Sequence, residues 1–381
     1  MPSLDRFAAA KLAALDAKPL RRRLAADERV DGIVVERGGR RLVSFSCNDY
    51  LNLSHHSKVK EAAAAAALRY GAGAGASRLV TGNHPLVRAL EEKLAAFKGV
   101  EAACVFGAGY LANAGIAPCL VGAADVIFVD ELSHACLWAG AKLSDAKVHA
   151  FRHNDIAHLA SLMQTHRAAH PHALVLTDGV FSMDGDLAPL DQLSALCEMH
   201  DAWLMVDDAH ALGVIGGGRG SAHAFAGANV PLQMGTLSKA AGSFGGYLCA
   251  SAPVVDLIKT RARTFVYSTG LPPASAGAAL AALDIIESDP ELVARPVARA
   301  RRFTRALNLP EAQSAIVPVI LGATERALEA AQMLEDAGFL VVPIRPPTVP
   351  DNTARLRFAL TAGHADADID RVADLVRGFV A

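Results

Sequence analysis

Short apolar segments alternate with segments of helical spacing between residues 102 and 250, and this alternation restricts the fold more than any other feature of the sequence. Continuous apolar segments are typical of strands buried on both faces. Repeated strand–helix units predict an α/β fold with a mostly parallel sheet covered by helices on both faces. The expected strands are residues 102–106, 126–129, 147–151, 173–177, 204–206, 230–234 and 245–250, with helices starting near residues 111, 135, 156 and 190.

Polar side chains follow two of these expected strands. Asp207 and His210 come directly after residues 204–206, and Lys239 follows residues 230–234 in a segment rich in hydroxyls and glycines. Open α/β sheets bind ligands at the carboxyl ends of their strands. We therefore expect these three side chains to meet at one site.

A lysine and a carboxylate at such an edge suit pyridoxal phosphate, which forms a Schiff base with a lysine and takes an anionic partner at its pyridine nitrogen. Asp207 would keep that nitrogen protonated, and His210 would bond either the ring oxygen or the aspartate itself. The simpler interpretation is that Asp207 and Asp208 end a strand and cap a helix, while Lys239 lies on the surface. Either fragment alone favours the simpler interpretation, whereas their order and separation favour the cofactor.

Three short motifs together resemble the α-oxoamine synthases: SCNDYL at residues 46–51, DDAH at 207–210 and TLSK at 236–239. The resemblance extends from about residue 20 to the C-terminus. It implies a fold-type-I, pyridoxal phosphate-dependent enzyme that works as a homodimer. The implied reaction condenses an amino acid with an acyl thioester and releases carbon dioxide. It also implies an N-terminal arm (1–40) that joins a small C-terminal α+β domain (289–381), with a large cofactor domain (41–288) between them.

The resemblance gives roles to residues whose own context is less specific. His134 would stack on the pyridine ring, although a lone histidine is more often structural, and Ser182 would reach the ring oxygen, although its segment reads as a turn. Glycines before the helix near residue 111 suit a phosphate, because a helix N-terminus offers free N–H groups. The implied phosphate contacts are Gly109, Tyr110 and Thr236, with Ser268 and Thr269 from the neighbouring subunit.

Two arginines compete for the carboxylate of the amino acid. The resemblance assigns Arg357, and a guanidinium fork suits a carboxylate. Arg355 lies on the same face of the expected strand at 354–360, so spacing alone cannot choose between them. Asn48 is the next candidate, and His134 completes the implied amino-acid contacts.

The segment RPPTVP at residues 345–350, with Thr348, resembles the branch of the family that uses L-alanine and a pimeloyl thioester on coenzyme A or an acyl-carrier protein. Glycine- or serine-using relatives remain the alternative. By resemblance Arg21 lies near the acyl entrance, whereas spacing alone indicates that residues 21–23 form a solvated helix face. A rival of another class is a non-catalytic or nucleotide-binding α/β protein, but the glycine-rich residues 71–78 lack the preceding strand or the G-K-[ST] of such sites.

The remaining segments have clear periodicity. Residues 86–97 predict an amphipathic helix with Glu91 and Glu92 facing outward, and Gly38-Gly39 divides an expected hairpin at 30–46. Other expected elements are helices at residues 4–26, 274–288, 324–337 and 367–379 and strands at residues 316–321, 340–344 and 354–360.

Composition excludes several classes of protein. The 381 residues exceed the usual size of one core, and 52% of them are hydrophobic, so two lobes are expected. A net charge of -2 gives no basic excess for nucleic acid or an anionic membrane. The six cysteines have no C-x-x-C spacing, so no metal site is expected. No segment reads as a signal peptide or a membrane span, which favours a cytoplasmic protein.

Overall fold

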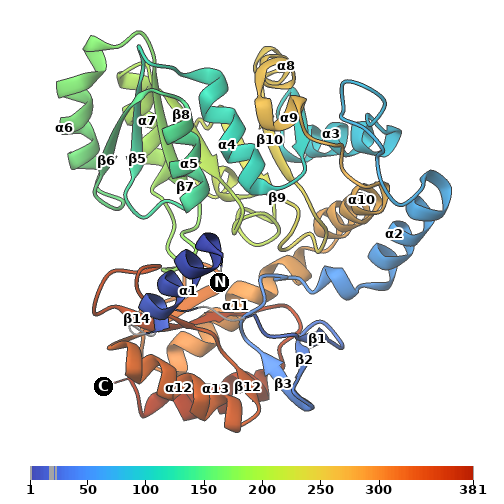
Figure 1. Cartoon of the computed structure of the whole chain (residues 1–381), viewed down its shortest axis with the longest axis vertical. Helices are drawn as coiled ribbons and strands as arrows, with labels where there is room; N and C mark the ends of the chain where they lie inside the picture. The colour runs from blue at the N-terminus through green and yellow to red at the C-terminus, as the bar shows by residue number, and fades with distance from the viewer. Residues whose placement is uncertain (1, 17–20, 22–23, 381) are drawn as a thin grey trace.

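The largest sheet of the computed structural model has seven strands in the order β4-β10-β9-β8-β7-β5-β6 (Figure 1). The structure describes residues 2–16, 21 and 24–380. Strands β5 to β9 run parallel, and β10 is antiparallel to both of its neighbours, so the prediction of a mostly parallel sheet is confirmed. The strands are β4 (Ala102–Phe106), β5 (Val126–Asp130), β6 (Lys147–Phe151), β7 (Ala173–Asp178), β8 (Trp203–Asp207), β9 (Leu232–Thr236) and β10 (Gly246–Ala250).

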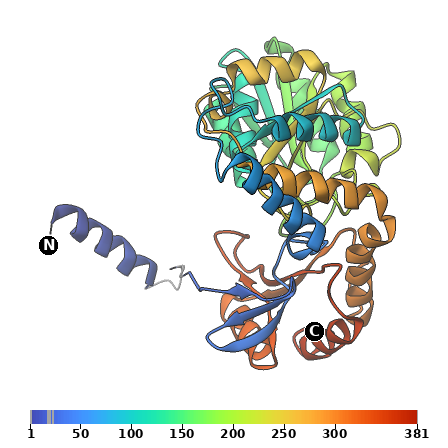
Figure 2. The ribbon, with the colours of Figure 1, turned by 90° about the vertical axis from the view of Figure 1, so that its right-hand side faces the viewer.

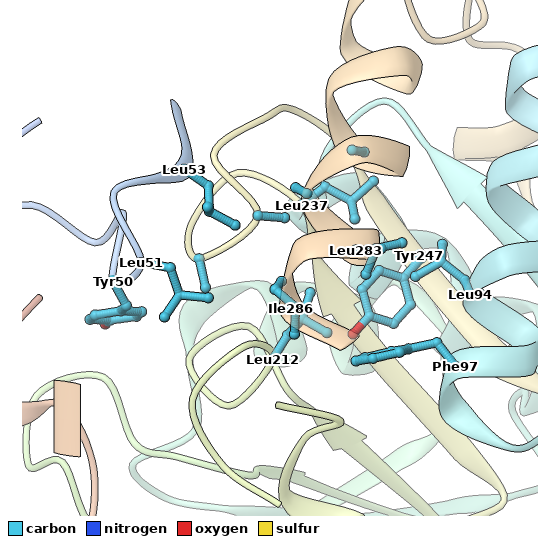
Figure 3. Close-up of a cluster of buried hydrophobic side chains, with 14 of the residues drawn as sticks. Tyr50, Leu51, Leu53, Leu94, Phe97, Leu212, Leu237, Tyr247, Leu283 and Ile286 are labelled. Atoms are coloured by element: carbon cyan, nitrogen blue, oxygen red, sulfur yellow. The ribbon is translucent and has the colours of Figure 1, made fainter. Parts of the chain in front are cut away.

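Helices cover both faces of this sheet because its strands are apolar on both faces. Along β10, Tyr247 and Cys249 join one hydrophobic cluster, whereas Leu248 and Ala250 join another on the opposite face. The first cluster packs under α3 (Pro85–Lys98) and α10 (Pro273–Ser288), and Figure 3 shows Tyr247 among Leu94, Phe97 and Leu283. The opposite face carries α4 (Gly109–Leu120), α8 (Ala252–Arg261) and α9 (Arg263–Val266).

Further helices flank the sheet in chain order. Helix α2 (Ser57–Tyr70) packs against α10, and α5 (Ala135–Leu143) packs against α4. Residues of α6 (Ile156–His166) and α7 (Leu190–Met199) cover β5, β7 and β8 around Phe128 and Leu204. Each of α5, α6 and α7 thus follows a parallel strand, as in a repeated strand–helix unit.

A second body is built from the C-terminal part of the chain. Strands β11 (Ile316–Gly322), β14 (Ala354–Ala359) and β13 (Pro343–Ile344) form a three-stranded antiparallel sheet. The buried side chains of this body include Phe303, Leu356 and Phe358. They lie between the sheet and three helices: α11 (Pro290–Ala306), α12 (Thr324–Asp336) and α13 (Asp366–Arg377).

The N-terminal hairpin joins this second body. Strands β2 (Val34–Arg37) and β3 (Arg40–Ser44) are connected by Gly38 and Gly39, whose φ angles of 55° and 77° fit a tight hairpin turn. The short strands β1 (Glu28–Arg29) and β12 (Phe339–Leu340) complete a sheet in the order β1-β2-β3-β12. Because β12 pairs in parallel with β3, the N- and C-terminal parts share one sheet.

Several expected elements differ from those in the structure. The described part of the expected helix at 4–26 is α1 (Ser3–Asp16); residues 21 and 24–26 are not helical, and residues 17–20 and 22–23 lie outside the described ranges. Figure 2 shows α1 projecting away from the rest of the chain, and none of its residues is buried. The expected strand at 340–344 is two strands, β12 and β13, in different sheets. No described helix is long and apolar enough to cross a membrane.

The prediction that Glu91 faces outward is wrong. Glu91 is 7% exposed, and its carboxylate pairs with Arg78 at 2.9 Å and with Lys259 at 3.0 Å. Helical spacing assigned Glu91 to the solvent face because Glu92 next to it is exposed, but two cations from distant segments cover it. A buried carboxylate needs such partners.

Candidate active site

The polar residues after β8 and β9 meet in a cavity of about 300 Å³ beside the second body. Lys239 and His210 line it from the large sheet, and Arg357 on β14 lines it from the second body. Strands that end at one sheet edge bring together side chains that are far apart in the sequence. The remaining lining residues are Ser46, Asn48, His134, Ser182, Met183, Val342 and Ile344.

Lys239 forms a hydrogen bond to the neutral imidazole of His210. Its Nζ lies 2.8 Å from His210 Nε2, and Nδ1 of the same ring lies 2.6 Å from Tyr50 Oη. Burial and the charges of Lys239 and Arg357 lower the pKa of His210 well below its ordinary value, so the ring is neutral. Nε2 therefore accepts from Lys239, and the Nδ1–H group donates to Tyr50.

Burial also makes the Lys239 amine more nucleophilic. It lowers the pKa of Lys239 from 10.5 to about 8, and the opposing charges of Asp207 and Asp178 do not restore the ordinary value. A lysine with a lowered pKa has more neutral amine near pH 7, and the neutral amine is the form that attacks a carbonyl.

Asp207 is held by donors on both oxygens. It is 3% exposed; its Oδ1 accepts from the backbone N–H of Ala209 at 2.8 Å, and its Oδ2 accepts from Asn113 Nδ2 at 2.7 Å. The structure thus places His210 against Lys239 and Tyr50 and not against Asp207. The carboxylate is fixed in direction, as the partner of a pyridine nitrogen must be.

His134 caps α5 and contacts the buried Asp178 through its backbone. Its backbone N–H donates to Asp178 Oδ2 at 2.7 Å, and its Nδ1 lies 2.7 Å from Cys136 Sγ. Burial, and then the charge of Asp207, raise the pKa of Asp178 well above its ordinary value, while burial lowers the pKa of His134. The imidazole is consequently neutral and able to stack on an aromatic ring.

The N-terminus of α4 provides the anion-binding end of the site. The residue before the helix is Ala108, whose side chain cannot cap it, so the first backbone N–H groups have no side-chain partner there. Gly109 packs so closely on Thr236 that an added Cβ would lie 3.3 Å from the threonine Cβ. Thr236 Oγ1 lies 2.8 Å from Ser238 Oγ. Free N–H groups beside two hydroxyls suit a phosphate.

The geometry separates the two arginines that spacing could not distinguish. Arg357 lines the cavity and donates to Asn48 Oδ1 at 3.1 Å and to the backbone carbonyl of Ser182. Arg355 instead forms an ion pair with Asp184 at 2.5 Å. Arg357 is therefore the arginine with access to a ligand in the cavity.

A larger cavity of about 910 Å³ adjoins the first one. The two share His134, Ser182 and Met183. Its walls include apolar side chains of α5 and of residues 347–350, among them Trp138 and Val349, and Thr348 also lines it. The expected substrate contact at Thr348 thus lies in a space suited to an apolar chain.

Seven of the expected contacts lie outside the linings of these cavities. Asp207, Gly109, Tyr110 and Thr236 belong to the sheet edge and to the start of α4. The other three are Arg21, Ser268 and Thr269. Arg21 pairs with Asp16 at 2.7 Å, and neither cavity has it in its lining. Ser268 and Thr269 also lie outside both linings, and Thr269 pairs with Ser77 in an isolated β-bridge. Their expected roles depend on a second subunit or on an acyl substrate.

Sequence reasoning missed the residues that support the site. Asn113, Tyr50 and Asp178 each bond a residue that was expected. Tyr50 lies in the motif at residues 46–51 but was given no role, and Asn113 and Asp178 belong to no motif. Asn113 offered one signal, since it is a polar side chain within the largely apolar helix α4. Asp178 offered another, because it follows a continuous apolar segment in the sequence. The structure then pairs it with Asp207 across β7 and β8.

These groups fit pyridoxal phosphate. Asn113 connects α4 to Asp207 at the end of β8, and Gly109 packs the start of α4 against Thr236, so one helix contacts both the carboxylate and the hydroxyls of the anion-binding end. Lys239, His134 and Ser182 line the neighbouring cavity. An amine with a lowered pKa, a carboxylate with fixed direction and a phosphate-binding helix end are the three groups that this cofactor needs.

Comparisons with known proteins agree with this geometry. The family model for class I and II aminotransferases matches residues 40–376. The chain is 70% identical to an 8-amino-7-oxononanoate synthase from Methylocella silvestris, over 90% of this chain and 98% of that protein. A serine palmitoyltransferase from S. paucimobilis, solved with a pyridoxal phosphate–myriocin aldimine, has a TM-score of 0.92 at 28% identity and covers 99% of this chain and 98% of its own. The 8-amino-7-oxononanoate synthase structure from Francisella tularensis has a TM-score of 0.76 at 28% identity, with coverages of 88% and 97%.

Proposed function

Because the chain belongs to the 8-amino-7-oxononanoate synthase family of pyridoxal phosphate-dependent acyltransferases, we propose that it joins L-alanine to a pimeloyl thioester and releases carbon dioxide and the thiol carrier. The enzyme acts in biotin biosynthesis. The carrier is coenzyme A or an acyl-carrier protein. The observation that carries the choice of reaction centre is that Lys239 and Arg357 line one small cavity.

Arg357 holds the carboxylate of alanine in this proposal. A guanidinium has five N–H donors, so its bonds to Asn48 and Ser182 leave others for a substrate. Two parallel bonds fix a carboxylate in direction and thereby orient the bonds at Cα. The adjacent Asn48 is set by Arg357 and Tyr50 and supports the same end of the substrate.

Lys239 removes the Cα proton of alanine. Bound pyridoxal phosphate supplies the electron sink that stabilises the resulting carbanion. A general base works best when its pKa lies near the working pH, and the pKa of Lys239 is about 8. His210, itself held by Tyr50, fixes the amine through the bond to Nζ.

The other cofactor contacts follow the same geometry. Asp207 would face the pyridine nitrogen, His134 would stack on the ring and Ser182 would reach the ring oxygen. Gly109, Tyr110 and Thr236 would hold the phosphate at the start of α4. The fixed direction of Asp207 supports the first of these assignments, because an anion aimed at the nitrogen keeps it protonated.

The acyl chain would occupy the larger cavity. Trp138 and Val349 offer apolar contacts to a methylene chain, and Thr348 lies among them. The cavity meets the smaller one at His134 and Ser182, so a thioester carbonyl at the junction would lie next to the space lined by Lys239 and Arg357. Arg21 would meet the distal end of this substrate.

A homodimer completes the proposed enzyme. Leu79, Val80 and Tyr267 are 60%, 73% and 77% exposed, close in sequence to the bridge between Ser77 and Thr269. Exposed apolar groups of this size support an interface. Ser268 and Thr269 would then reach the partner's cofactor phosphate.

We also propose the division into an arm (1–40), a cofactor domain (41–288) and a small domain (289–381). The shared sheet of β3 and β12 supports the union of the arm with the small domain. We propose a cytoplasmic location as well, and the six free cysteines support it, because reducing compartments keep thiols unpaired.

Steady-state turnover with alanine, glycine and serine tests the proposal against its nearest alternative. Each amino acid is paired with pimeloyl-CoA, pimeloyl acyl-carrier protein, acetyl-CoA and palmitoyl-CoA. The highest kcat/KM is expected for alanine with a pimeloyl thioester. A higher value for glycine with acetyl-CoA, or for serine with palmitoyl-CoA, would assign the enzyme to another branch.

A further inference from the structure

Three neighbouring strands, β7, β5 and β6, end at one edge of the large sheet (Figure 1). The segment after β5 carries His134, and the segment after β7 carries Ser182. Both of these residues line the substrate cavity. The segment after β6, residues 152–155, contributes nothing to the lining of that cavity, yet it contacts both of the other segments.

His153 forms that contact with both nitrogens of its ring. Nδ1 lies 3.1 Å from Asp130 Oδ1, and Nε2 lies 2.8 Å from Asp186 Oδ2. An ionised carboxylate only accepts hydrogen bonds, so both nitrogens donate and the ring is an imidazolium. This cation therefore lies between two anions that would otherwise repel one another.

Both aspartates also form hydrogen bonds with the backbone of their own segments. Asp130 is 0% exposed, its Oδ1 also accepts from the N–H of Leu132 at 2.9 Å, and it lies four residues before His134. The carbonyl of Asp186 accepts from the N–H of Phe181 at 3.0 Å, beside Ser182. A shift of either aspartate can therefore displace a side chain that lines the cavity, His134 or Ser182, only four residues away.

Asn154 forms a second connection between the same segments. Its backbone N–H donates to Asp130 Oδ2 at 2.8 Å, and its Nδ2 donates to Asp186 Oδ2 at 3.0 Å. Its φ of 53° places it in the left-handed region, which asparagine tolerates better than most residues. The two residues together make four hydrogen bonds to two carboxylates.

The surroundings keep His153 charged. Burial lowers its pKa, but the hydrogen bonds and charges of Asp130 and Asp186 outweigh this and raise the pKa to about 10. The ring of Phe181 packs edge-on at 4.3 Å. Among the other charged groups nearby, Glu131 accepts from the backbone N–H of His153 at 3.1 Å, adding a third negative charge.

The neighbouring basic and acidic residues of this loop are engaged with one another. Arg152 pairs with Asp155 at 2.7 Å, and the Nδ1 of His158 accepts from the backbone N–H of Arg152. The positive charge between Asp130 and Asp186 thus comes from His153.

We propose that His153 is a positioning residue, whose imidazolium fixes His134 and Ser182 relative to one another at the cofactor ring. The role rests on cofactor binding at this site and not on the identity of the amino acid or the acyl group. Loss of the cation would leave Asp130 and Asp186 facing each other and allow the two segments to separate. Cofactor affinity should fall, and turnover should fall further because displacement by about 1 Å costs on the order of 10²-fold.

The test measures the dissociation constant of pyridoxal phosphate from the absorbance of titrated apoenzyme, without either substrate. His153→Gln should bind the cofactor about 10-fold more weakly, with turnover about 10²-fold lower. His153→Arg should recover most of both losses, because a guanidinium is a cation with several donors. Arg152→Gln is the matched control: it removes an ion pair from the same loop and should change neither quantity.

The pH dependence gives an independent measurement. The pKa of His153 is raised from its ordinary value of about 6.5 to about 10. The ion-pair bridge from His153 to Asp130 and Asp186 is therefore fully present below about pH 6.5 and is lost as the pH rises through about 10. An arginine at this position keeps its charge throughout this range. The ratio of the wild-type dissociation constant to that of His153→Arg should therefore be constant from about pH 7 to 9 and rise above about pH 10.

Three results would overturn the role. They are wild-type cofactor affinity in His153→Gln, an equal loss in Arg152→Gln, and a loss that a folded His153→Arg protein does not recover. If His153→Arg does not fold, Asp186→Asn replaces it, because it breaks the same bridge from the other side. Its effect should not add to that of His153→Gln, and full additivity would reject the bridge.

Discussion

Two lysines lie near the adjacent residues Asp207 and Asp208 at the end of β8, and they differ in the hydrogen-bond partners of the ammonium group. Lys98 Nζ lies 2.7 Å from Asp208 Oδ2 and 2.6 Å from the carbonyl of Arg219, with both charged side chains at most 1% exposed. Lys239, which feels the charge of Asp207, instead forms a hydrogen bond to the neutral imidazole of His210. The adjacent aspartates therefore have different partners: Asp208 pairs with a lysine, whereas Asp207 accepts from Asn113 and a backbone N–H group.

The difference shows what makes a buried lysine reactive. An ammonium that touches a carboxylate and a carbonyl is stabilised in its charged form. Lys239 has negative charges nearby, but its ammonium bonds an imidazole and not a carboxylate, so burial dominates and its pKa falls to about 8. A buried lysine is chemically useful where its charged form is left incompletely satisfied.

The comparison can be tested first at Lys239. We expect Lys239→Ala to reduce turnover by several powers of ten, because general base catalysis alone contributes roughly 10²–10⁴ and the bond to the cofactor is lost as well. Steady-state assays measure the loss. The free energy of unfolding should stay within about 1 kcal/mol of wild type or increase, because a poorly satisfied buried charge is removed. Turnover close to wild type would reject the assignment of Lys239.

The second experiment concerns Lys98. Lys98→Met should leave Asp208 buried without its cation and reduce the free energy of unfolding by about 3–5 kcal/mol, measured by urea denaturation. Lys98→Met with Asp208→Asn should recover part of this loss, because the uncompensated charge is gone. If Lys98→Met were as stable as Lys239→Ala, the two regions would not differ in the way proposed.

The third experiment compares Arg357 with Arg355. Arg357→Lys keeps the charge but loses the planar fork, so the alanine KM should rise and kcat should fall, each about 10-fold, while the KM for the thioester stays unchanged. Arg355→Lys serves as the control, since Arg355 is engaged by Asp184. A larger effect in Arg355→Lys would reverse the assignment.

The smallest expected effect is a pH dependence. The pKa of Lys239 falls from 10.5 unfolded to about 8 folded, so between these values the unfolded chain binds more protons. This group therefore makes the apoenzyme more stable as the pH rises from about 8 to 10.5. Wild type and Lys239→Gln can be compared by thermal unfolding across this range. The Tm of wild type relative to the variant should rise with pH, and a constant difference would contradict the lowered pKa.

The sequence predicted the sheet edge better than the residues that support it. Continuous apolar strands ending in Asp207 and before Lys239 were visible because strand length and polarity are local properties. Contacts such as Asn113 with Asp207 join residues 94 positions apart, and no local pattern encodes them. Helix α11 was missed for a different reason, since Pro290 and Pro296 obscure its periodicity although both are accommodated within it.

The second body shows the same limit. Residues 340–344 have the apolar composition of one strand, yet β12 pairs with β3 whereas β13 pairs with β14. Composition predicts that such a segment is extended and buried, but the choice of partner depends on segments far away in the chain. Glu91 likewise looks solvent-facing until Arg78 and Lys259 are placed beside it.

The order of synthesis determines when β3 can pair with β12, because residues 339–340 are made long after residues 40–44. A ribosome delivers Asn48 early and Arg357 more than three hundred residues later, and these two residues form a hydrogen bond in the proposed carboxylate-binding site. The nascent chain can pair the strands of its large sheet while β3 still has an open edge, which is a hazard for association between chains. The part of the site proposed to bind the amino acid is therefore assembled last, and a chain interrupted just before β14 contains Lys239 but lacks Arg357.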